Sequence, residues 1–429
     1  AEEAIPSTER DLWMYYGRTY NKASHGHKDA LNIGVHAFGI DLMPDLGYPR
    51  YADEKDQHRR SLVGNTTAHN TVMVNNTQQV GQIVGQPQHF DDTDFVKLFD
   101  VADENAYSGT TDQYRRTSAM IRIDEENSYV IDLFRVSGGS THRYSFHGAE
   151  TSGIATTGLD LVKQTDGEGN YVGTLAGANQ PYPDNCDVND PTGARYFFNV
   201  DTQEGDIGNF TADYSILDTW NVLGEGTSMP TDIHLKLTML GEFDKVTLTD
   251  AKPPENKPGN PSKLRYVFAE RNGQDLDSCF TAVIEPYRGE SNIASIEALT
   301  VLEGQSEASE MDVRAVKVTL TNGRIDYIVN ALDENKEYTV IDGDIQIPFQ
   351  GFFGVYSKDS ADSETSRYYL NDGCKIGEAS NSGLAAVTGT VTDFTEELAV
   401  ENSITIHANE DVALEDLAGK YIYIENGGT

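Results

Sequence analysis

The stretch Tyr129-Val130-Ile131-Asp132-Leu133-Phe134-Arg135-Val136 decides the fold class of this chain. It is a short run of β-branched and aromatic residues, which is typical of a β-strand. Similar runs, most of them bounded by Gly, Asn, Asp or Pro, recur along the sequence: Thr71–Val74, Ala119–Ile123, His234–Leu240, Lys245–Leu248, Tyr266–Ala269, Thr281–Ile284, Ala315–Leu320, Ile325–Val329, Phe352–Val355 and Tyr421–Ile424. Amphipathic helical periodicity is not sustained beyond about three turns. We therefore predict an all-β fold, with a large multi-stranded antiparallel β-sandwich followed by a smaller β-rich C-terminal domain.

The length of 429 residues is enough for about two to three domains. The segment Leu302–Met311 is acidic and poor in large apolar residues, which favours a domain boundary there. We expect an N-terminal lead-in over residues 1–12, the β-sandwich over 13–305 and the C-terminal β-domain over 306–429. The segment Lys252–Ser262 holds four prolines in eleven residues, so we expect a loop there and not a central strand.

Acidic side chains dominate the charged groups: 32 Lys and Arg against 69 Asp and Glu give a formal net charge of −37. We therefore expect no nucleic-acid partner, because nucleic-acid binding needs a positive field that displaces counterions. A solvated acidic surface is the ordinary explanation for this charge, and it suits a saline or extracellular setting. No apolar run approaches the length of a membrane span. Three widely spaced cysteines, Cys186, Cys279 and Cys374, give no disulfide framework and no CxxC metal knuckle, and their number leaves room for one disulfide bridge.

Half of the ten histidines fall between residues 25 and 69. Within this window, His27, Asp45 and His69 are a candidate metal triad, because imidazole nitrogen and carboxylate oxygen together suit zinc; another divalent metal would also fit. Asp29 could instead supply the carboxylate ligand or support one. The alternative is that each is an ordinary polar residue at the end of a strand, and the spacing alone leaves both interpretations open.

The segment between His27 and Asp45 is expected to form a hairpin around the turn Ala37-Phe38-Gly39. Its two far ends return to one another, which lets His27 and Asp45 approach. His69 opens the next expected strand, so three ligands at neighbouring strand ends are geometrically sensible. If the segment is extended, His25 and His27 point to the same face, because side chains alternate with period two. One imidazole could then hold a metal while the other faces a substrate.

A basic and aromatic patch between residues 16 and 60 stands out in this acidic chain. Bidentate Arg contacts and ring stacking could capture an anionic sugar there. The candidates for substrate binding are Tyr16, Arg18, Tyr48, His58, Arg59 and Arg60. The alternative is surface charge that balances the neighbouring Asp53, Glu54 and Asp56. The sequence has no GxSxG, P-loop or HExxH motif, so it gives no support to hydrolase or kinase chemistry.

Several motifs, in their order along the chain, resemble the β-sandwich signature of the heparinase II/III-like polysaccharide lyases. The resemblance begins with His25-Gly26-His27-Lys28-Asp29-Ala30-Leu31-Asn32, Asp45-Leu46-Gly47-Tyr48 and Ala68-His69-Asn70-Thr71-Val72. It continues through Tyr114-Arg115-Arg116-Thr117, the strand at 129–136, Tyr144-Ser145-Phe146-His147-Gly148 and Val283-Ile284-Glu285-Pro286-Tyr287. It covers the chain from about Leu12 to Arg288. Because the motifs are long and ordered, the resemblance favours the metal site over unrelated polar residues.

The resemblance implies a reaction. Enzymes of this family cleave uronic-acid polysaccharides by β-elimination: the uronate carboxylate is neutralised, the C5 proton is abstracted and the 4-linked oxygen leaves. A Tyr commonly serves as acid, or as both base and acid, and an Asn or His neutralises the carboxylate. By motif position, His25 resembles the sandwich histidine that lines the catalytic cleft, so it is the candidate catalytic residue. His27, Asp45 and His69 resemble the family's structural zinc ligands.

The resemblance also implies partners. An anionic polysaccharide or oligosaccharide would be the substrate, in a bacterial secreted or periplasmic setting. Family members normally carry an N-terminal (α/α) toroid with the catalytic Tyr and the Asn or His, whereas this sequence begins just before the sandwich. We expect a toroid as a separate fragment or chain, and no lyase activity without it.

The substrate class follows from finer features of the same motifs. Residues 25–49 are closer in form to alginate and oligoalginate lyases, many of them exolytic, than to heparin enzymes. The alternatives are a glycosaminoglycan lyase of the heparin or chondroitin type, and a non-catalytic carbohydrate-binding β-sandwich.

Overall fold

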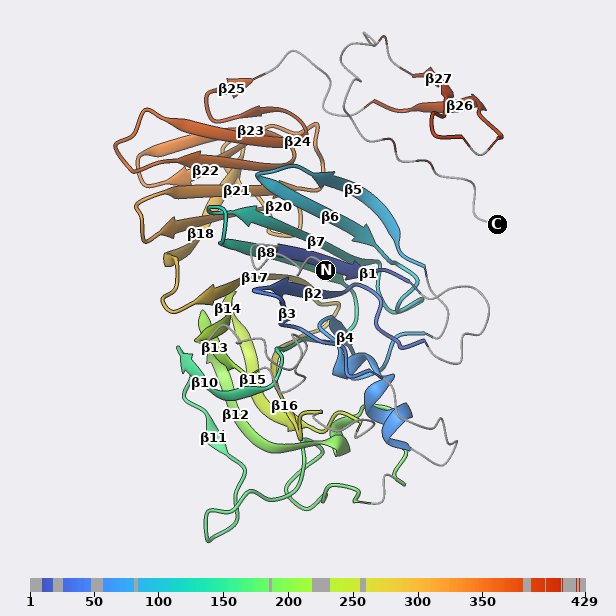
Figure 1. Cartoon of the computed structure of the whole chain (residues 1–429), viewed down its shortest axis with the longest axis vertical. Coiled ribbons are helices and arrows are strands. Elements are labelled where there is room, and N and C mark those ends of the chain that lie inside the picture. The colour runs from blue at the N-terminus through green and yellow to red at the C-terminus, as the bar shows by residue number, and fades with distance from the viewer. Residues whose placement is uncertain are drawn as a thin grey trace, which may run out of the picture. The chain divides into compact units, whose positions relative to one another are not determined.

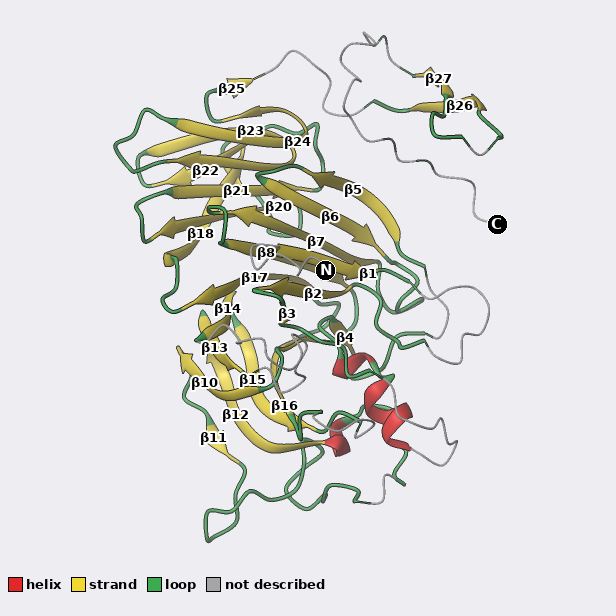
Figure 2. Cartoon of the chain, viewed as in Figure 1, coloured by secondary structure: helices red, strands yellow, loops and turns green. Residues whose placement is uncertain are grey.

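The described residues of the computed structural model form strands and turns, with a few short helices (Figure 1, Figure 2). These residues are 10–17, 26–47, 57–80, 84–184, 187–217, 232–254, 260–380, 387–397, 399–409 and the single positions 411, 422 and 424. The helical segments among them are the π-helix η1 (Arg59–Val63) and the 3-10 helices η2 (Thr66–Ala68) and η3 (Ala194–Tyr196). The prediction of an all-β fold is confirmed.

The chain divides into two compact units, Ala1–Ser291 and Asn292–Thr429. The first unit contains three antiparallel sheets. The smallest has the order β1 (Arg10–Tyr15), β2 (Asn32–Ala37), β3 (Ile40–Asp41). An eight-stranded sheet has the order β10 (Thr151–Thr157), β13 (Phe210–Ile216), β14 (Ile233–Leu240), β17 (Asp277–Arg288), β8 (Ser128–Ser137), β7 (Gln113–Arg122), β6 (Val96–Ala102), β5 (Gln86–Asp92). A six-stranded sheet has the order β11 (Val162–Lys163), β12 (Phe197–Ile207), β15 (Phe243–Ala251), β16 (Leu264–Asn272), β9 (Thr141–His147), β4 (Val72–Val74).

The eight-stranded and six-stranded sheets form the sandwich, and alternate residues of their strands fill the space between them. Leu235 and Leu237 of β14 share one buried core with Val267 and Ala269 of β16. Successive side chains of a strand point to opposite faces, so every second residue of these strands reaches the core. Ile33 of β2 belongs to the same core, which shows that the three-stranded sheet packs against it as well.

The other face of the six-stranded sheet carries a second buried cluster. Tyr266 and Phe268 of β16 pack there with Leu62 of η1 and Ala68 of η2. Tyr266 and its neighbour Val267 therefore face opposite sides of the same sheet. This cluster holds the helical segment at 57–69 against the sheet, and with it the residue that follows η2, His69.

A buried ion pair lies in the first core. The guanidinium of Arg116 on β7 donates to both carboxylate oxygens of Asp132 on β8, each at 2.8 Å, and both side chains are fully buried. Ser118 donates to the same carboxylate at 2.6 Å, and Tyr144 donates to it at 2.8 Å. The charge of Asp132 is thus fully hydrogen-bonded, which is the condition under which a buried ion pair is tolerated.

The second unit is built around a closed ring of strand pairings. Its strands are β18 (Ile293–Glu303), β19 (Ser306–Glu307), β20 (Val313–Leu320), β21 (Ile325–Ala331), β22 (Tyr338–Asp342), β23 (Ile345–Lys358), β24 (Ser366–Ile376), β25 (Ala379–Ser380), β26 (Gly389–Phe394) and β27 (Ile404–Ala408). The pairings run β18-β20-β21-β23, and β22 closes the ring because it pairs with both β23 and β18. Val301, Val329, Val340 and Phe349 belong to the core of this unit.

The segments predicted as strands from 71 to 355 each lie within or overlap a strand, and the described residues of the predicted loop, 252–254 and 260–262, lie outside strands, between β15 and β16. The last predicted strand, 421–424, falls mostly outside the described residues. The structure divides the chain between Ser291 and Asn292, whereas the sequence analysis places the boundary at 305/306, in the turn between β18 and β19. All residues of the acidic segment Leu302–Met311 are exposed or partly exposed.

Candidate metal centre

Four possible metal ligands converge in the first unit. They are His27 and Asp29, which precede β2, Asp45, which follows β3, and His69, which follows η2. One ligand atom from each residue lies within 4.8 Å of those of the other three. The structure thus brings together the predicted triad of His27, Asp45 and His69, together with Asp29, the alternative carboxylate ligand expected from the sequence.

The β2–β3 hairpin places two of these ligands beside each other. Its register pairs Ala37 with Ile40, so Phe38 and Gly39 form the two-residue turn expected from the sequence. Both turn residues have positive φ, 56° at Phe38 and 78° at Gly39. Positive φ at both central positions is the geometry that matches the twist of a tight hairpin. The chain therefore reverses sharply, and the segment before β2 meets the segment after β3.

The distances in the cluster fit a metal. Oδ2 of Asp45 lies 3.3 Å from Nδ1 of His27 and 3.1 Å from Nδ1 of His69. Ligands about 2.0–2.1 Å from a tetrahedral zinc ion are about 3.3 Å from one another. Both ring nitrogens of His69 are buried and make no aligned hydrogen bond to a described residue, and the same holds for Oδ1 of Asp29. Buried polar atoms normally have partners, so this arrangement suits ligands that point at a cation.

The electrostatics of the cluster agree with this geometry. Burial raises the pKa of the Asp45 carboxyl, but the His27 and His69 imidazoles outweigh it and hold that pKa well below its usual range. Burial lowers the pKa of His69, whereas Asp45, Asp29 and the nearby Val63 carbonyl raise it, and the net shift is upward. Burial raises the pKa of Asp29. The two carboxylates therefore draw positive charge into the cluster, either as a proton or as a divalent cation.

Buried side chains fix the backbone that carries the ligands. The amide of Gln79 receives a hydrogen bond from the Ala30 N–H at 2.8 Å and donates to the Ala30 carbonyl at 2.9 Å. Arg116 donates to the carbonyls of Leu31 and Asn70, which follow Asp29 and His69 closely in the chain. Leu31 has a φ of 60°, a conformation that a non-glycine residue keeps only when its surroundings enforce it. The role of Gln79 was not predicted from the sequence, and Arg116 was recognised there only as part of the motif at 114–117.

The predicted substrate-binding residues differ in their exposure and in their contacts. Arg60 is exposed and Arg59 is partly buried on η1, whose end at Gly64 lies against His27. Tyr16 follows β1 and is 45% exposed. His58 is buried, with Nε2 2.9 Å from the Lys252 carbonyl oxygen and its ring against Tyr196. The remaining candidates, His25, Arg18 and Tyr48, lie outside the described residues.

A further histidine borders the cluster on the sheet side. His147 at the end of β9 is buried, and its ring centroid lies 4.6 Å from that of Tyr266. Burial lowers the pKa of His147 to about 4, against the opposing effect of the Gly148 carbonyl. His147 is therefore neutral at physiological pH and contributes packing next to the cluster.

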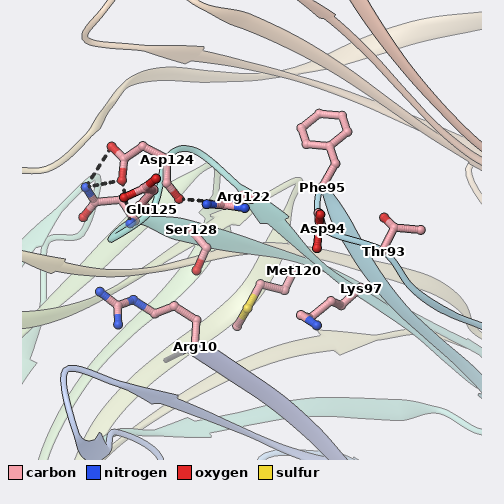
Figure 3. A pocket seen from close by; sticks show the side chains of 11 residues that line it. Arg10, Thr93, Asp94, Phe95, Lys97, Met120, Arg122, Asp124, Glu125 and Ser128 are labelled. Carbon is pink, nitrogen blue, oxygen red and sulfur yellow. Dashed lines mark hydrogen bonds between the residues drawn. The ribbon is translucent and has the colours of Figure 1, made fainter. Parts of the chain in front are cut away.

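A cavity of about 390 Å³ in the same unit is lined by Arg10, the first residue of β1, and by residues of the β5–β6 and β7–β8 hairpins (Figure 3). Figure 3 shows Arg10 and Lys97 on either side of Met120. Arg10 donates to the Glu126 carbonyl, and Lys97 pairs with Asp92. These cations are engaged in contacts within the protein, so we assign no function to this cavity. Among the described residues, no helix is long and apolar enough to cross a membrane.

Comparison with known proteins bears on the family. No curated protein sequence matches this chain. Similar solved structures include the heparan sulfate lyase HepC from Pedobacter heparinus, at 12% identity over 70% of this chain and 36% of that chain, with a TM-score of 0.44. Heparinase III is similar at 12% identity over 76% of this chain and 40% of that chain, with a TM-score of 0.47.

The aligned part of this chain thus spans well under half of these structures. Residues 15–226 match the family model described as Heparinase II/III-like, C-terminal. This range includes all four clustered ligands, the β2–β3 hairpin and the β7–β8 ion pair. Residues 15–226 are therefore similar to the heparinase II/III-like C-terminal family, the class of domain that the sequence motifs resemble.

Proposed function

We propose that this chain is the β-sandwich part of a polysaccharide lyase that cleaves a uronic-acid polysaccharide by β-elimination. The observation that carries the proposal is the match of residues 15–226 to the heparinase II/III-like C-terminal family model. The arginines of η1 support it, because η1 ends beside the clustered ligands and its guanidinium groups carry positive charge on that side of the sandwich. A β-elimination needs such charge near the uronate carboxylate, where negative charge builds up in the transition state.

The proposed metal is zinc, held by His27, Asp45 and His69, with Asp29 available as a further ligand. The mixed nitrogen and oxygen donors and the distances of 3.1 and 3.3 Å support this choice. When bound, the ion would cross-link the hairpin to the segment after η2. We assign it a structural role and no step of the elimination.

The proposed substrate side is the side of the cluster that carries η1. A side chain at Gly64 would lie 3.8 Å from Cδ2 of His27, so η1 ends directly beside the metal ligands. Arg59 and Arg60 on η1 would pair with uronate carboxylates or sulfates, for which planar guanidinium groups are well suited. His25, two residues before His27, is proposed to face the uronate and to share in carboxylate neutralisation or proton transfer.

The proposed substrate is a glycosaminoglycan of the heparin or heparan type. The description of the matching family model, which names the heparinases, favours it over the alginate expected from residues 25–49. Alginate is retained as the second candidate, because the chain has only 32 Lys and Arg and a densely sulfated chain would need many cationic contacts. The helical toroid is proposed as the partner that supplies the catalytic Tyr and the Asn or His.

The test is a lyase assay on heparan sulfate, chondroitin sulfate and alginate, read as ultraviolet absorbance of the unsaturated uronate product. The chain is assayed alone and together with an (α/α) toroid polypeptide from the same source. We expect product from heparan sulfate only in the combined sample, and loss of that product in His25→Ala. Product from alginate alone would replace the substrate proposal, and product from the isolated chain would refute the need for a toroid. No product from any of the three polymers would refute the lyase proposal.

A further inference from the structure

A second cavity of about 400 Å³ lies at one edge of the sandwich, between β10 of the eight-stranded sheet and β12, β15 and β16 of the six-stranded sheet. We call it the sheet-edge pocket. The polar groups that line it include Tyr171, Asn199, Asp201, Asp250, Lys263 and Arg265. Ile154 and Leu248 also line it, and Leu248 belongs to the sandwich core. The pocket therefore combines a cluster of fixed polar groups with an apolar strip.

The sheet-edge pocket is separate from the candidate metal centre. Arg265 and Tyr266 are neighbours on β16, so their side chains lie on opposite faces of the six-stranded sheet. Tyr266 donates to the Ala68 carbonyl, next to His69, whereas Arg265 lines the pocket. A ligand in the pocket would not touch the metal ligands or η1.

The polar groups of the pocket hold one another in place. The carboxylate of Asp250, 1% exposed, accepts from Asn199 Nδ2 at 2.8 Å, Lys263 Nζ at 2.7 Å and Arg265 Nη1 at 3.1 Å. Asp201 accepts from the Tyr171 hydroxyl at 2.6 Å and from Arg265. Side chains that are fixed before a ligand arrives lose little conformational entropy on binding, so this cluster is preorganised.

The backbone of β12 is bent to build this cluster. The register of β12 with β15 shifts between Phe198 and Asp201, and Asn199 in the shift has a φ of 51°. The Asn199 carbonyl accepts from Arg265 Nη1 at 2.8 Å, while its side chain reaches Asp250. A bulge of this kind redirects side chains, and a left-handed non-glycine residue costs about 1 kcal/mol or more. Asn adopts this conformation more readily than most residues, so it suits the bulge.

The charged residues that line the pocket indicate which chemical class of ligand it can bind. Asp201 and Asp250 are balanced by Lys263 and Arg265, so the pocket has no excess charge for a sulfate or phosphate. The Lys263 side chain is 52% exposed and spends one of its three donors on Asp250. Tyr171 is 36% exposed, and the Lys163 ammonium lies 5.6 Å from the centroid of its ring. Hydroxyl groups, which donate and accept, match the fixed polar groups, and the C–H face of a sugar ring matches an exposed aromatic side chain.

We propose that the sheet-edge pocket binds an unsulfated sugar unit of a polysaccharide, with its hydroxyls on Lys263 and Asn199 and one ring face on Tyr171. The pocket is a second saccharide site, away from the metal-bearing side. The proposal requires neither a metal nor lyase activity, so its test is independent of the proposed function.

The experiment is isothermal titration calorimetry on the full chain with three hexasaccharides: a neutral β-glucan, an unsulfated uronate oligomer and a sulfated heparan oligomer. We expect at least one unsulfated oligomer to bind. Its affinity should fall about tenfold in Tyr171→Ala, which removes the ring, and stay near that of the wild type in Tyr171→Phe. Lys263→Ala should weaken binding several-fold. Far-ultraviolet circular dichroism and the melting temperature check that each variant is folded.

Two controls separate this pocket from the rest of the molecule. Lys245→Ala removes the same charge from β15 at an exposed pair with Glu204, outside the pocket, and should not change binding. Lys97→Ala removes a cation that pairs with Asp92, also outside the pocket, and should not change it either. The proposal is overturned if no unsulfated oligomer binds or if Tyr171→Ala binds as tightly as the wild type. It is also overturned if only the sulfated oligomer binds through Lys263, or if Lys97→Ala abolishes binding.

Discussion

Oδ2 of Asp45 lies 3.1 Å from Nδ1 of His69, although Asp45 follows the β2–β3 hairpin and His69 follows the 3-10 helix η2. A cation on this pair would tie two structural elements together that otherwise meet mainly through backbone hydrogen bonds and packing. A cation that binds only the folded form adds its binding free energy to the stability of that form. The first prediction follows from this relationship.

Removing a bound metal should destabilise the first unit. We expect about one zinc per chain by elemental analysis, and a lower melting temperature after treatment with a chelator. At a free zinc concentration of 1,000 times Kd, the bound ion would contribute about 4 kcal/mol. His69→Ala should lack the metal and should no longer respond to the chelator.

His36→Ala is the matched control for this metal prediction. His36 on β2 lies near Asp11 at 3.8 Å and is not among the clustered ligands. It should keep the wild-type zinc content and the wild-type response to the chelator. A wild-type protein without zinc or another divalent metal would refute the metal site.

Asp103 should make the protein less stable as the pH rises from about 4 to 6. Burial raises the pKa of Asp103 to about 6, against the opposing effect of the Asn105 and Ala106 amides. Between the unfolded and folded pKa values the folded state binds more protons, so its stability falls with increasing pH. The shift corresponds to up to about 3 kcal/mol at neutral pH.

Urea unfolding at pH 4.5 and 7.5 tests this prediction. Asp103→Asn removes the charge with little change of shape, so it should stabilise the protein at pH 7.5 and flatten the pH dependence. Asp124→Asn is the control of opposite sign, because the Asn127 side chain and the Glu126 and Asn127 amides hold the pKa of Asp124 below its usual value despite burial. If Asp103→Asn destabilises the protein at pH 7.5, the carboxylate has a stabilising partner and the prediction is wrong.

Arg116→Met should destabilise the sandwich by about 3–5 kcal/mol, because it leaves the buried carboxylate of Asp132 without its cation. It should also weaken metal binding, since the carbonyls of Leu31 and Asn70 lose their donor. Urea unfolding and zinc titration measure the two effects. Arg122→Met on the same strand, which removes an exposed side chain hydrogen-bonded to the Asp124 carbonyl at 2.9 Å, should change stability by about 0.5 kcal/mol or less. Equal stability of the two variants would contradict a central role for the buried pair.

Gly34→Ala should loosen the three-stranded sheet. Gly34 on β2 pairs with Trp13 on β1, and a Cβ at Gly34 would lie 2.2 Å from two atoms of the Trp13 ring. The ring would have to move, at a cost of about 1–3 kcal/mol. Gly208→Ala is the control, because a Cβ there meets nothing within 4 Å. Thermal unfolding followed by tryptophan fluorescence should show a lower midpoint for Gly34→Ala alone; an unchanged midpoint would show that Trp13 moves freely.

Local features of the sequence predicted much of the fold. Runs such as 129–136 are strands because their β-branched and aromatic side chains suit a pleated surface, and Phe38-Gly39 is the hairpin turn. The convergence of His27 and Asp45 followed from that turn, and the inclusion of His69 followed from motif order. These inferences needed only neighbouring residues or an ordered set of motifs.

Contacts that depend on strand register could not be predicted in the same way. Asp132 was quoted as part of a strand, but its partner Arg116 is set by the pairing of β7 with β8. His58 was expected to bind substrate, yet its contacts come from Tyr196 and Lys252, far along the chain. The sheet-edge pocket assembles residues from loops and strands between 151 and 265, and only the folded register shows which of them share a face.

The alternation of Arg265 and Tyr266 on β16 has an evolutionary consequence. A single-residue insertion or deletion within β16 would exchange their faces, placing a guanidinium in the aromatic cluster beside the metal ligands and a tyrosine in the sheet-edge pocket. Both sites would fail in one event, whereas a substitution at either position would damage one site at a time. We therefore expect selection to remove insertions and deletions from β16 and to tolerate them in the connection before it. Related chains that keep one of the two sites should then also keep the other.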